Sequence, residues 1–392
     1  MKGRIETLPL LPMKYTLVAI LIVLSLATQA QEFSEQDTTT QRRGLIDPLF
    51  DIADGVVDFI SGEKWSFIPA VVYSPETNLG LGARAIRIFK AQEDLKGNLR
   101  PSSLPITFLY TLNKQAIFTT ELDLWRNENR DYINARIELT DYPFKFYGIG
   151  NELLAEDEEF YATRYAYFHL NYERQLVPGL YLGPRYEFRV DDIYRKEPGG
   201  ILETGQVAGS EGQRLSGIGL VMNFDTRDNI FQPTRGWFNR LSWMSFQNAL
   251  GSNFTFDQYY LDLRKYLEVY ERHVLVLQSY WSFTTGAPPF QHVSLIGGSD
   301  LMRGYFEGRY RDRHAVVHQA EYRLPVYRNL GLVLFGSAGQ VAKQVDHFGW
   351  NRMKYGAGLG VRYKLNKEGL NLRIDIAYGD QRAFYFGLNE VL

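Results

Sequence analysis

The stretch YINARIELT, residues 132–140, decides the fold because its side chains alternate strictly in character. From Ile133 onward the odd-numbered positions are apolar, and the even-numbered positions are polar or charged. Successive side chains of a β-strand point to opposite faces, so this stretch is predicted to form a strand with one apolar and one polar face. Segments 182–191 and 371–376 repeat the pattern. The sequence therefore predicts an all-β fold.

Two features favour a membrane barrel over a soluble sandwich, which is the alternative. Charges alternate deep within long strands, and the other face is rich in aromatic residues, with 26 Tyr and 25 Phe among 392 residues. No segment after the N-terminal region approaches 18 consecutive apolar residues, which a membrane-spanning helix needs. In lipid only helices and closed barrels satisfy every backbone N–H and C=O, so we predict a transmembrane β-barrel.

The turn pattern divides residues 65–392 into sixteen strands of an antiparallel barrel, an even number as bacterial barrels require. We expect the strands to start near Trp65, Asn78, Leu104, Gln115, Asp131, Thr163, Gly179, Arg214, Gly236, Phe254, His273, His314, Asn329, Lys354, Leu370 and Arg382. The long connections 141–162, 192–213, 287–313 and 342–353 all follow odd-numbered strands. Long connections lie outside the cell in such barrels, so the N-terminus is expected on the periplasmic side.

The N-terminal region resembles an export sequence. Residues 1–30 are predicted to be a signal peptide, with Lys14 before an apolar core and a small-residue cleavage site at 28–30. Either Met1 or Met13 can be the true start. A retained anchor is the alternative. Together with the barrel pattern, the signal peptide places the protein in the outer membrane of a Gram-negative bacterium.

Two further stretches carry recognisable motifs. The run GGSDLMRGYFEGRYRDRHAVVHQAEYRLPVY, 297–327, resembles the sixth extracellular loop and following strand of the BamA/TamA superfamily, also called the bacterial surface antigen family. In that family the loop carries a Val-Arg-Gly-Phe/Tyr motif, which Met302, Arg303, Gly304 and Tyr305 match with Met for Val. The run NFDTRDNIFQPTRGWF, 223–238, resembles the family's turn between strands eight and nine. The resemblance covers residues 65–392.

The resemblance implies that this loop folds back into the barrel as a luminal plug, with Arg303 packed against the inner wall. A guanidinium offers five donors in a planar fork and stacks on aromatic rings. Gly304 allows close approach and positive φ. An outward surface loop is the alternative.

One position departs from the family pattern. The family places an aspartate on strand thirteen as the partner of the motif arginine, whereas Ser337 stands here. A hydroxyl supplies no opposite charge, and a buried unpaired guanidinium is costly. We therefore expect Glu321 or Asp375, both in the lumen-facing phase of their strands, to pair with Arg303.

The region before the barrel is short. Full members of the superfamily carry periplasmic POTRA domains, and residues 31–64 are too few for one. We expect a periplasmic segment that is partly disordered. Within it, 44–60 has apolar residues at helical spacing, which fits either an amphipathic helix or a linker with a frayed helix.

The family resemblance also implies a function. Clients of the family are thought to enter at the seam between first and last strands, here Phe67 and Tyr73 against Phe384, Phe386 and Gly387. We predict insertion or translocation of proteins or lipids at the outer membrane. The alternative is a scaffold or pore barrel that acts with a periplasmic or surface partner.

The sequence carries no clear motif for catalysis or metal binding. The Gly209-Ser210-Glu211 region lacks the strand-to-helix context of a nucleophile elbow. His314 and His318 lie roughly 13 Å apart on a strand, too far to share an ion. We therefore expect no enzyme activity, no cofactor and no metal. With a net charge of −2, nothing indicates nucleic acid. The expected partners of this monomeric barrel are membrane lipid and client proteins or a periplasmic protein.

Overall fold

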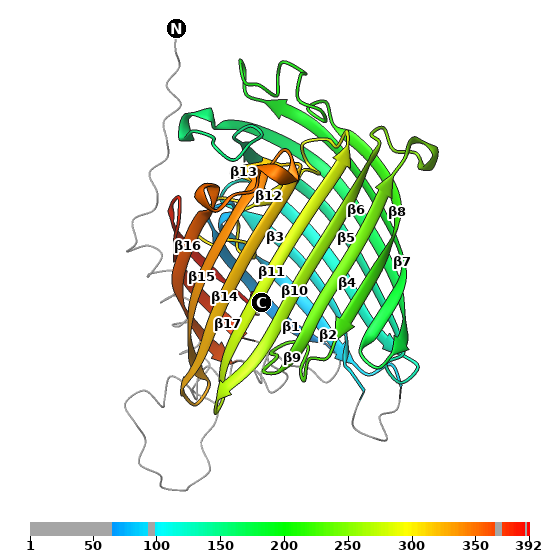
Figure 1. The fold of residues 1–392 in the computed structure, drawn as a ribbon, viewed down its shortest axis with the longest axis vertical. Coiled ribbons are helices and arrows are strands. Elements are labelled where there is room, and N and C mark those ends of the chain that lie inside the picture. The colour runs from blue at the N-terminus through cyan, green and yellow to red at the C-terminus, as the bar shows by residue number, and fades with distance from the viewer. Residues whose placement is uncertain (1–64, 93–98, 365–370, 389) are drawn as a thin grey trace, which may run out of the picture. The chain divides into compact units, whose positions relative to one another are not determined.

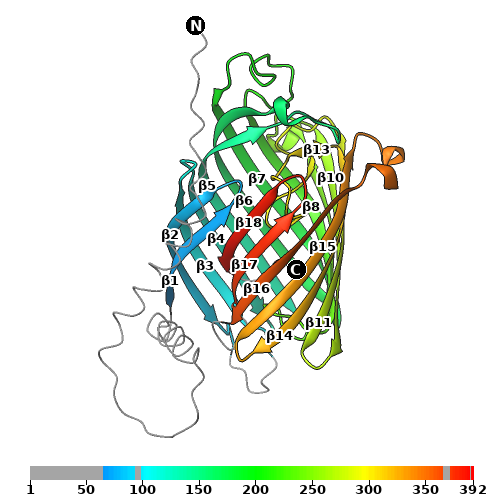
Figure 2. The same cartoon turned by 90° about the vertical axis from the view of Figure 1, so that its left-hand side faces the viewer.

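The computed structural model describes residues 65–92, 99–364, 371–388 and 390–392. The predicted signal peptide, both candidate start residues and the 31–64 segment lie outside the described residues. Within the described chain, sixteen antiparallel strands form one closed barrel in sequence order, and the first strand pairs with the last (Figures 1 and 2). The predicted sixteen-stranded barrel is therefore confirmed.

The strands of the first half of the barrel begin close to the predicted positions. They are β1 (Ser66–Ser74), β2 (Asn78–Phe89), β3 (Ser102–Thr111), β4 (Ala116–Arg126), β5 (Asp131–Phe146), β6 (Glu159–Val177), β7 (Leu180–Lys196) and β8 (Gln213–Asp225). The strand lengths are unequal, since β6 has 19 residues and β1 has 9.

The second half adds eight wall strands and a small separate sheet. The wall strands are β9 (Gly236–Phe246), β10 (Phe256–Tyr270), β11 (His273–Gly286), β14 (His314–Tyr327), β15 (Leu330–Ala342), β16 (Lys354–Lys364), β17 (Asn371–Tyr378) and β18 (Arg382–Leu388). The separate sheet pairs β12 (Ser294–Ile296) with β13 (Tyr310–Asp312). In the part of the chain that the structure describes, four 3-10 turns lie in the loops: η2 (Ala155–Asp157), η3 (Asn248–Leu250), η4 (Val345–His347) and η5 (Trp350–Arg352).

Two of the predicted loops are shorter than expected. The strand pairing of β5 and β6 continues to Phe146 and Glu159, so the connection between them is 147–158 rather than 141–162. The reason is packing: Phe144 and Phe146 are buried in an aromatic cluster that includes Phe290 and Phe306. Strand β7 likewise runs on to Lys196.

The alternation of the sequence becomes the two faces of the wall. On β17, Arg373 and Asp375 are buried, whereas Ile376 is 50% exposed. Inward-facing ion pairs recur around the ring, for example Arg189 with Asp191 at 2.7 Å. Outward-facing apolar side chains without a protein partner suit a lipid environment, because lipid removes them from water.

No helix among the described residues is long and apolar enough to cross a membrane.

Candidate functional site: the inward loop and the seam

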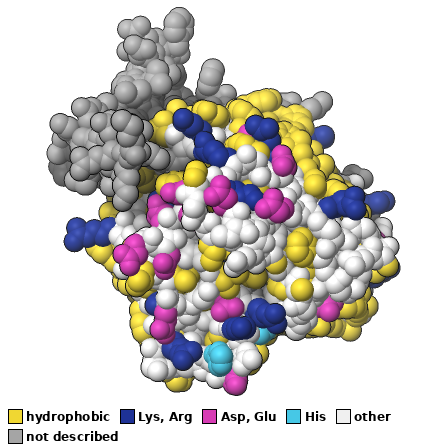
Figure 3. All heavy atoms as spheres, turned by 90° about the horizontal axis from the view of Figure 1, so that it is seen from above, with side chains coloured by type: hydrophobic (Ala, Val, Ile, Leu, Met, Phe, Trp, Pro, Cys, Tyr) yellow, Lys and Arg dark blue, Asp and Glu magenta, His cyan; other side chains and the backbone are white. Residues whose placement is uncertain are grey.

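The connection between β11 and β14, residues 287–313, lies against the inner face of the wall. Gln258 of β10 donates to the His292 carbonyl at 2.6 Å, and the hydroxyls of Ser282 and Ser294 are 2.7 Å apart. Gln319 of β14 donates to the Asp300 carbonyl at 3.0 Å. Seen from the loop end, described atoms fill the centre of the ring (Figure 3). The segment is therefore held by polar side chains that alternate inward on three strands.

Arg303 is the most constrained residue of this segment. Its side chain is 1% exposed, and its Nη1 lies 2.5 Å from Asp375 Oδ2 while Nη2 pairs with Glu321 Oε1. The guanidinium carbon lies 3.5 Å from the centre of the Phe335 ring. One side chain thus ties the loop to β14, β15 and β17. Removing one member of such a buried ion group leaves uncompensated charge, which costs about 3–5 kcal/mol.

The third candidate partner, Ser337, makes a different contact. Its hydroxyl lies 3.5 Å from the Gly356 carbonyl, at the limit of a hydrogen bond. Among the described hydrogen bonds and ion pairs, none joins Ser337 to Arg303. The two carboxylates therefore supply the opposite charge that a hydroxyl at position 337 lacks.

The neighbours of Arg303 fix the backbone on both sides. Met302 has a φ of 62°, is fully buried, and donates its backbone N–H to Gln319 at 3.0 Å. Gly304 has a φ of 101° and donates its N–H to the Tyr385 hydroxyl at 3.0 Å. A Cβ at this position would lie 2.8 Å from the Tyr378 carbonyl carbon, so only glycine fits. The Tyr305 hydroxyl donates to the Tyr355 carbonyl at 2.8 Å.

The ion pairs continue from Arg303 toward the end of the chain. Arg362 Nη1 lies 2.5 Å from the second oxygen of Asp375, and its Nε lies 2.8 Å from Glu390. Arg323 lies 3.4 Å from Glu321 and donates to the Leu392 carbonyl at 2.6 Å. None of these arginine contacts was predicted from the sequence. Arg323, however, lies two positions from Glu321 on the same strand, so its side chain faces the lumen as well. This regularity could have identified Arg323 from the sequence.

A second acidic contact joins the loop to the turn between β1 and β2. The backbone N–H of Glu307 donates to Glu76 Oε1 at 2.9 Å. Burial, together with the nearby charges of Glu76 and Asp300, raises the pKa of Glu307 to about 7, although Arg311 acts in the opposite direction. Burial also raises the pKa of Glu76. The loop therefore holds a carboxyl group that titrates near neutral pH beside the first strand.

The Asp-x-Arg-Asp stretch forms an ordered turn between β8 and β9. Asp225 accepts hydrogen bonds from Arg227 at 2.9 Å and from Arg100 at 2.7 Å. Asp228 accepts the backbone N–H groups of Thr234 and Arg235. These bonds hold the connection between β8 and β9 in a defined conformation.

The seam between β1 and β18 is much weaker than its neighbours. The two strands share a single residue pair, Tyr73 with Phe386, whereas every residue of β1 pairs with β2. An edge contact between the Tyr73 and Phe384 rings, 5.4 Å apart, adds to it. Phe67 is 65% exposed and has no β18 partner, and Gly387 pairs with Arg373 of β17. The ring is thus closed at one end of β1 only.

The described residues contain no group of three or more His, Cys, Asp or Glu that could hold a metal ion.

These features define a class. A closed sixteen-stranded barrel with apolar side chains outward, charged pairs inward and an arginine-anchored inner loop is an outer-membrane β-barrel. Residues 105–390 match the Omp85 superfamily domain, so the chain belongs to the Omp85 superfamily. The resemblance given by the motifs is therefore confirmed.

Solved structures share the fold at low sequence identity. BamA from Haemophilus ducreyi lacking POTRA domains 1–3 has a TM-score of 0.56 and 12% identity, covering 84% of this chain and 70% of that one. CdiB from Acinetobacter baumannii has a TM-score of 0.55 and 12% identity, covering 84% and 60%. CdiB from Escherichia coli has a TM-score of 0.56 and 9% identity, covering 84% and 63%. The chain thus spans less than two thirds of either CdiB. The comparison with curated proteins found no match.

Proposed function

We propose that this barrel assists the insertion or translocation of proteins or lipids at the outer membrane through the seam between β1 and β18. The observation that carries the proposal is the single residue pair that joins these strands. Elsewhere in the wall, separating two strands breaks a long ladder of hydrogen bonds. At the seam it breaks the fewest, so this is where the wall opens at the lowest cost in free energy.

The seam also offers a strand edge to a client. Most of β1 pairs on one side only, with β2, so its other edge has backbone donors and acceptors without a strand partner among the described residues. Such an edge pairs readily with an added strand. We propose that a client strand adds here while the barrel wall is open.

The rest of the molecule supports a closed lumen. The 287–313 segment fills the loop end and is tied to the wall through Arg303. We propose that this segment is a plug that prevents ion leakage while the seam works, and that the short-turn end of the barrel faces the periplasm. An open pore fits this arrangement less well, because the inner loop would obstruct it. A scaffold that acts with a partner would not require a weakly paired seam.

The test is to lock the seam with a disulfide. The chain has no cysteine, so Tyr73→Cys/Phe386→Cys introduces the only thiols, at positions that face each other. The matched control is Val71→Cys/Leu81→Cys, which joins β1 to β2. Each variant is placed in proteoliposomes, and the folding of an unfolded outer-membrane barrel is followed by its heat-modifiable gel mobility.

We expect the unmodified barrel to accelerate folding of this client. The oxidised seam variant should lose the acceleration and regain it on reduction, while the control should be active in both states. Equal activity of the oxidised and reduced seam variant would exclude passage through the seam.

A further inference from the structure

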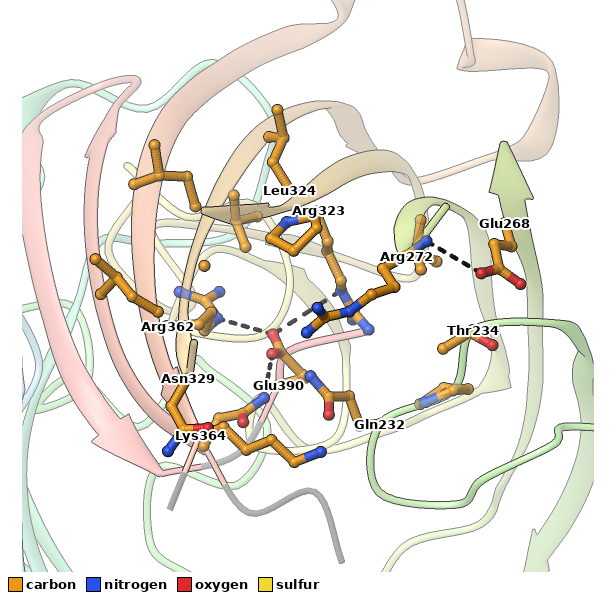
Figure 4. Close-up of a pocket in the computed structure, with 18 of the residues that line it drawn as sticks. Gln232, Thr234, Glu268, Arg272, Arg323, Leu324, Asn329, Arg362, Lys364 and Glu390 are labelled. Carbon is orange, nitrogen blue, oxygen red and sulfur yellow. Dashed lines mark hydrogen bonds and ion pairs between the residues drawn. The ribbon is translucent and has the colours of Figure 1, made fainter. Parts of the chain in front are cut away.

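A cavity of about 250 Å³ lies at the short-turn end of the barrel, and no part of the proposed seam function uses it. The ends of β10, β11, β14, β15 and β16 surround it, together with the turn at Gln232–Thr234 (Figure 4). Among the described residues, five cationic and two acidic side chains line it: Arg272, Arg323, Arg328, Arg362, Lys364, Glu268 and Glu390. The cavity therefore carries an excess of positive charge.

Two of these cations are buried and have guanidinium nitrogens that form no hydrogen bond with the residues that the structure describes. The side chain of Arg323 is 9% exposed and that of Arg362 is 6% exposed. Nε and Nη1 of Arg323 and Nη2 of Arg362 form no hydrogen bond with the described residues. A buried donor without an acceptor is costly, so these nitrogens favour an added acceptor.

The acidic residue inside the cavity is already engaged. Glu390 accepts from Arg362 Nε at 2.8 Å and from Asn371 Nδ2 at 2.6 Å, one bond on each of its oxygens. It lies 3.9 Å from Arg323 Nε, beyond hydrogen-bond distance. Figure 4 shows Arg272, Arg323 and Arg362 directed toward the Glu390 carboxylate from different elements. Several donors thus converge on one region with too few acceptors.

We propose that this cavity binds the phosphate group of an anionic ligand. A phosphate presents several acceptor oxygens, and arginine forks bind them with paired, charge-assisted hydrogen bonds. Arg272 and Lys364 add positive charge at the rim, which attracts an anion.

Two sources of phosphate fit this chemistry: inorganic phosphate in solution, and the headgroup of an anionic phospholipid. Leu330 and Leu332 of β15 line the same cavity, and Leu332 is 43% exposed on the outer face of the wall. The cavity therefore reaches the rim where lipid begins. Arg303, Glu321 and Asp375 do not line the cavity, although Arg323 pairs with Glu321 and Arg362 pairs with Asp375. The strands β1 and β18 do not line it either, so failure of this proposal and failure of the seam proposal are distinguishable.

The experiment is isothermal titration calorimetry of the refolded full chain in lauryldimethylamine oxide micelles, at constant ionic strength. Inorganic phosphate is the first probe and dihexanoyl phosphatidic acid is the second. The test variant is Arg272→Gln/Lys364→Gln, which removes two rim charges outside the buried ion pairs. Arg362→Lys keeps the positive charge but removes the planar, paired donors of the guanidinium. The control is Arg130→Gln, an exposed arginine in another short turn at the same end.

We expect saturable binding, with a dissociation constant that each cavity variant raises by about tenfold, the effect of losing one or two charge-assisted hydrogen bonds. Arg130→Gln should leave it unchanged. Tighter binding of the phosphatidic acid would identify a lipid headgroup as the ligand, and equal or weaker binding would identify free phosphate. No saturable heat with either probe, or equal weakening by Arg130→Gln, would overturn the proposal.

Discussion

Tyr73 of β1 faces Phe386 of β18, and this is the one residue pair that joins the two ends of the sheet. All the other neighbouring strands of the wall are joined by longer ladders. The short length of the last strand, 7 residues, adds to the difference. The barrel is therefore closed by a contact that is small compared with the rest of its wall, and this contact defines where the proposed function takes place.

Arg303→Ala should release the inner loop. The substitution leaves Glu321 and Asp375 buried without their shared cation, and we expect the free energy of unfolding to fall by about 3–5 kcal/mol. Ion conductance in planar bilayers should rise, and proteases should cleave within 287–313. The control is Arg313→Ala, which changes an exposed arginine of the same segment. Unchanged conductance and unchanged cleavage in Arg303→Ala would contradict a plug.

Gly304→Ala should weaken the same contact through the backbone alone. An alanine would adopt a φ of 101° and meet the backbone of Tyr378 at 2.8 Å, so we expect a loss of about 1–3 kcal/mol in the urea unfolding of the barrel. Gly387→Ala is the matched control, because a Cβ there lies 4.0 Å from the nearest side-chain atom. If both variants unfold at the same urea concentration as the unmodified chain, the tight approach at Gly304 is not required.

The attachment of the loop should depend on pH through Glu307. Its pKa in the folded protein, about 7, lies above the unfolded value, so the folded state favours the protonated form. Stability is then highest below the unfolded value near 4.5 and falls as the pH rises toward 7. Protease cleavage of the loop should be slower at pH 5.5 than at pH 8.

The variant Glu307→Gln separates this effect from other titrations. It stays neutral at every pH, so the rates of cleavage at pH 5.5 and pH 8 should become similar. The groups that act on Glu307 are Glu76, Asp300, Glu138 and Arg311, and all four remain in this variant. A pH dependence that survives the substitution would show that Glu307 is not its cause.

The wall of the barrel could be predicted from the sequence because two local rules determine it. Side-chain alternation fixes which residues face the lumen, and glycine, proline and polar turns fix where strands end. The start of β5 at Asp131 and of β11 at His273 follow from these rules alone. The inward phase of Glu321 and Asp375 follows from the same alternation.

The inside of the barrel could be predicted only in part. The short β12–β13 pair was not predicted, because strands of three residues show no periodic pattern in the sequence. The inward position of Glu390 and Leu392 was also not predicted, because it depends on contacts with Arg362 and Arg323, which are distant in sequence. Local patterns specify a strand and its faces, but not which loop or terminus fills the space that the strands enclose.

Hydrogen–deuterium exchange of the refolded chain tests the central claim most directly, because it measures how often each strand separates from its neighbours. We predict that peptides covering 66–74 and 382–388 exchange at least about tenfold faster than the peptide covering 159–177, and that an unfolded outer-membrane client changes exchange at the seam alone. Uniformly slow exchange around the whole ring, unaffected by the client, would contradict a wall that opens between β1 and β18.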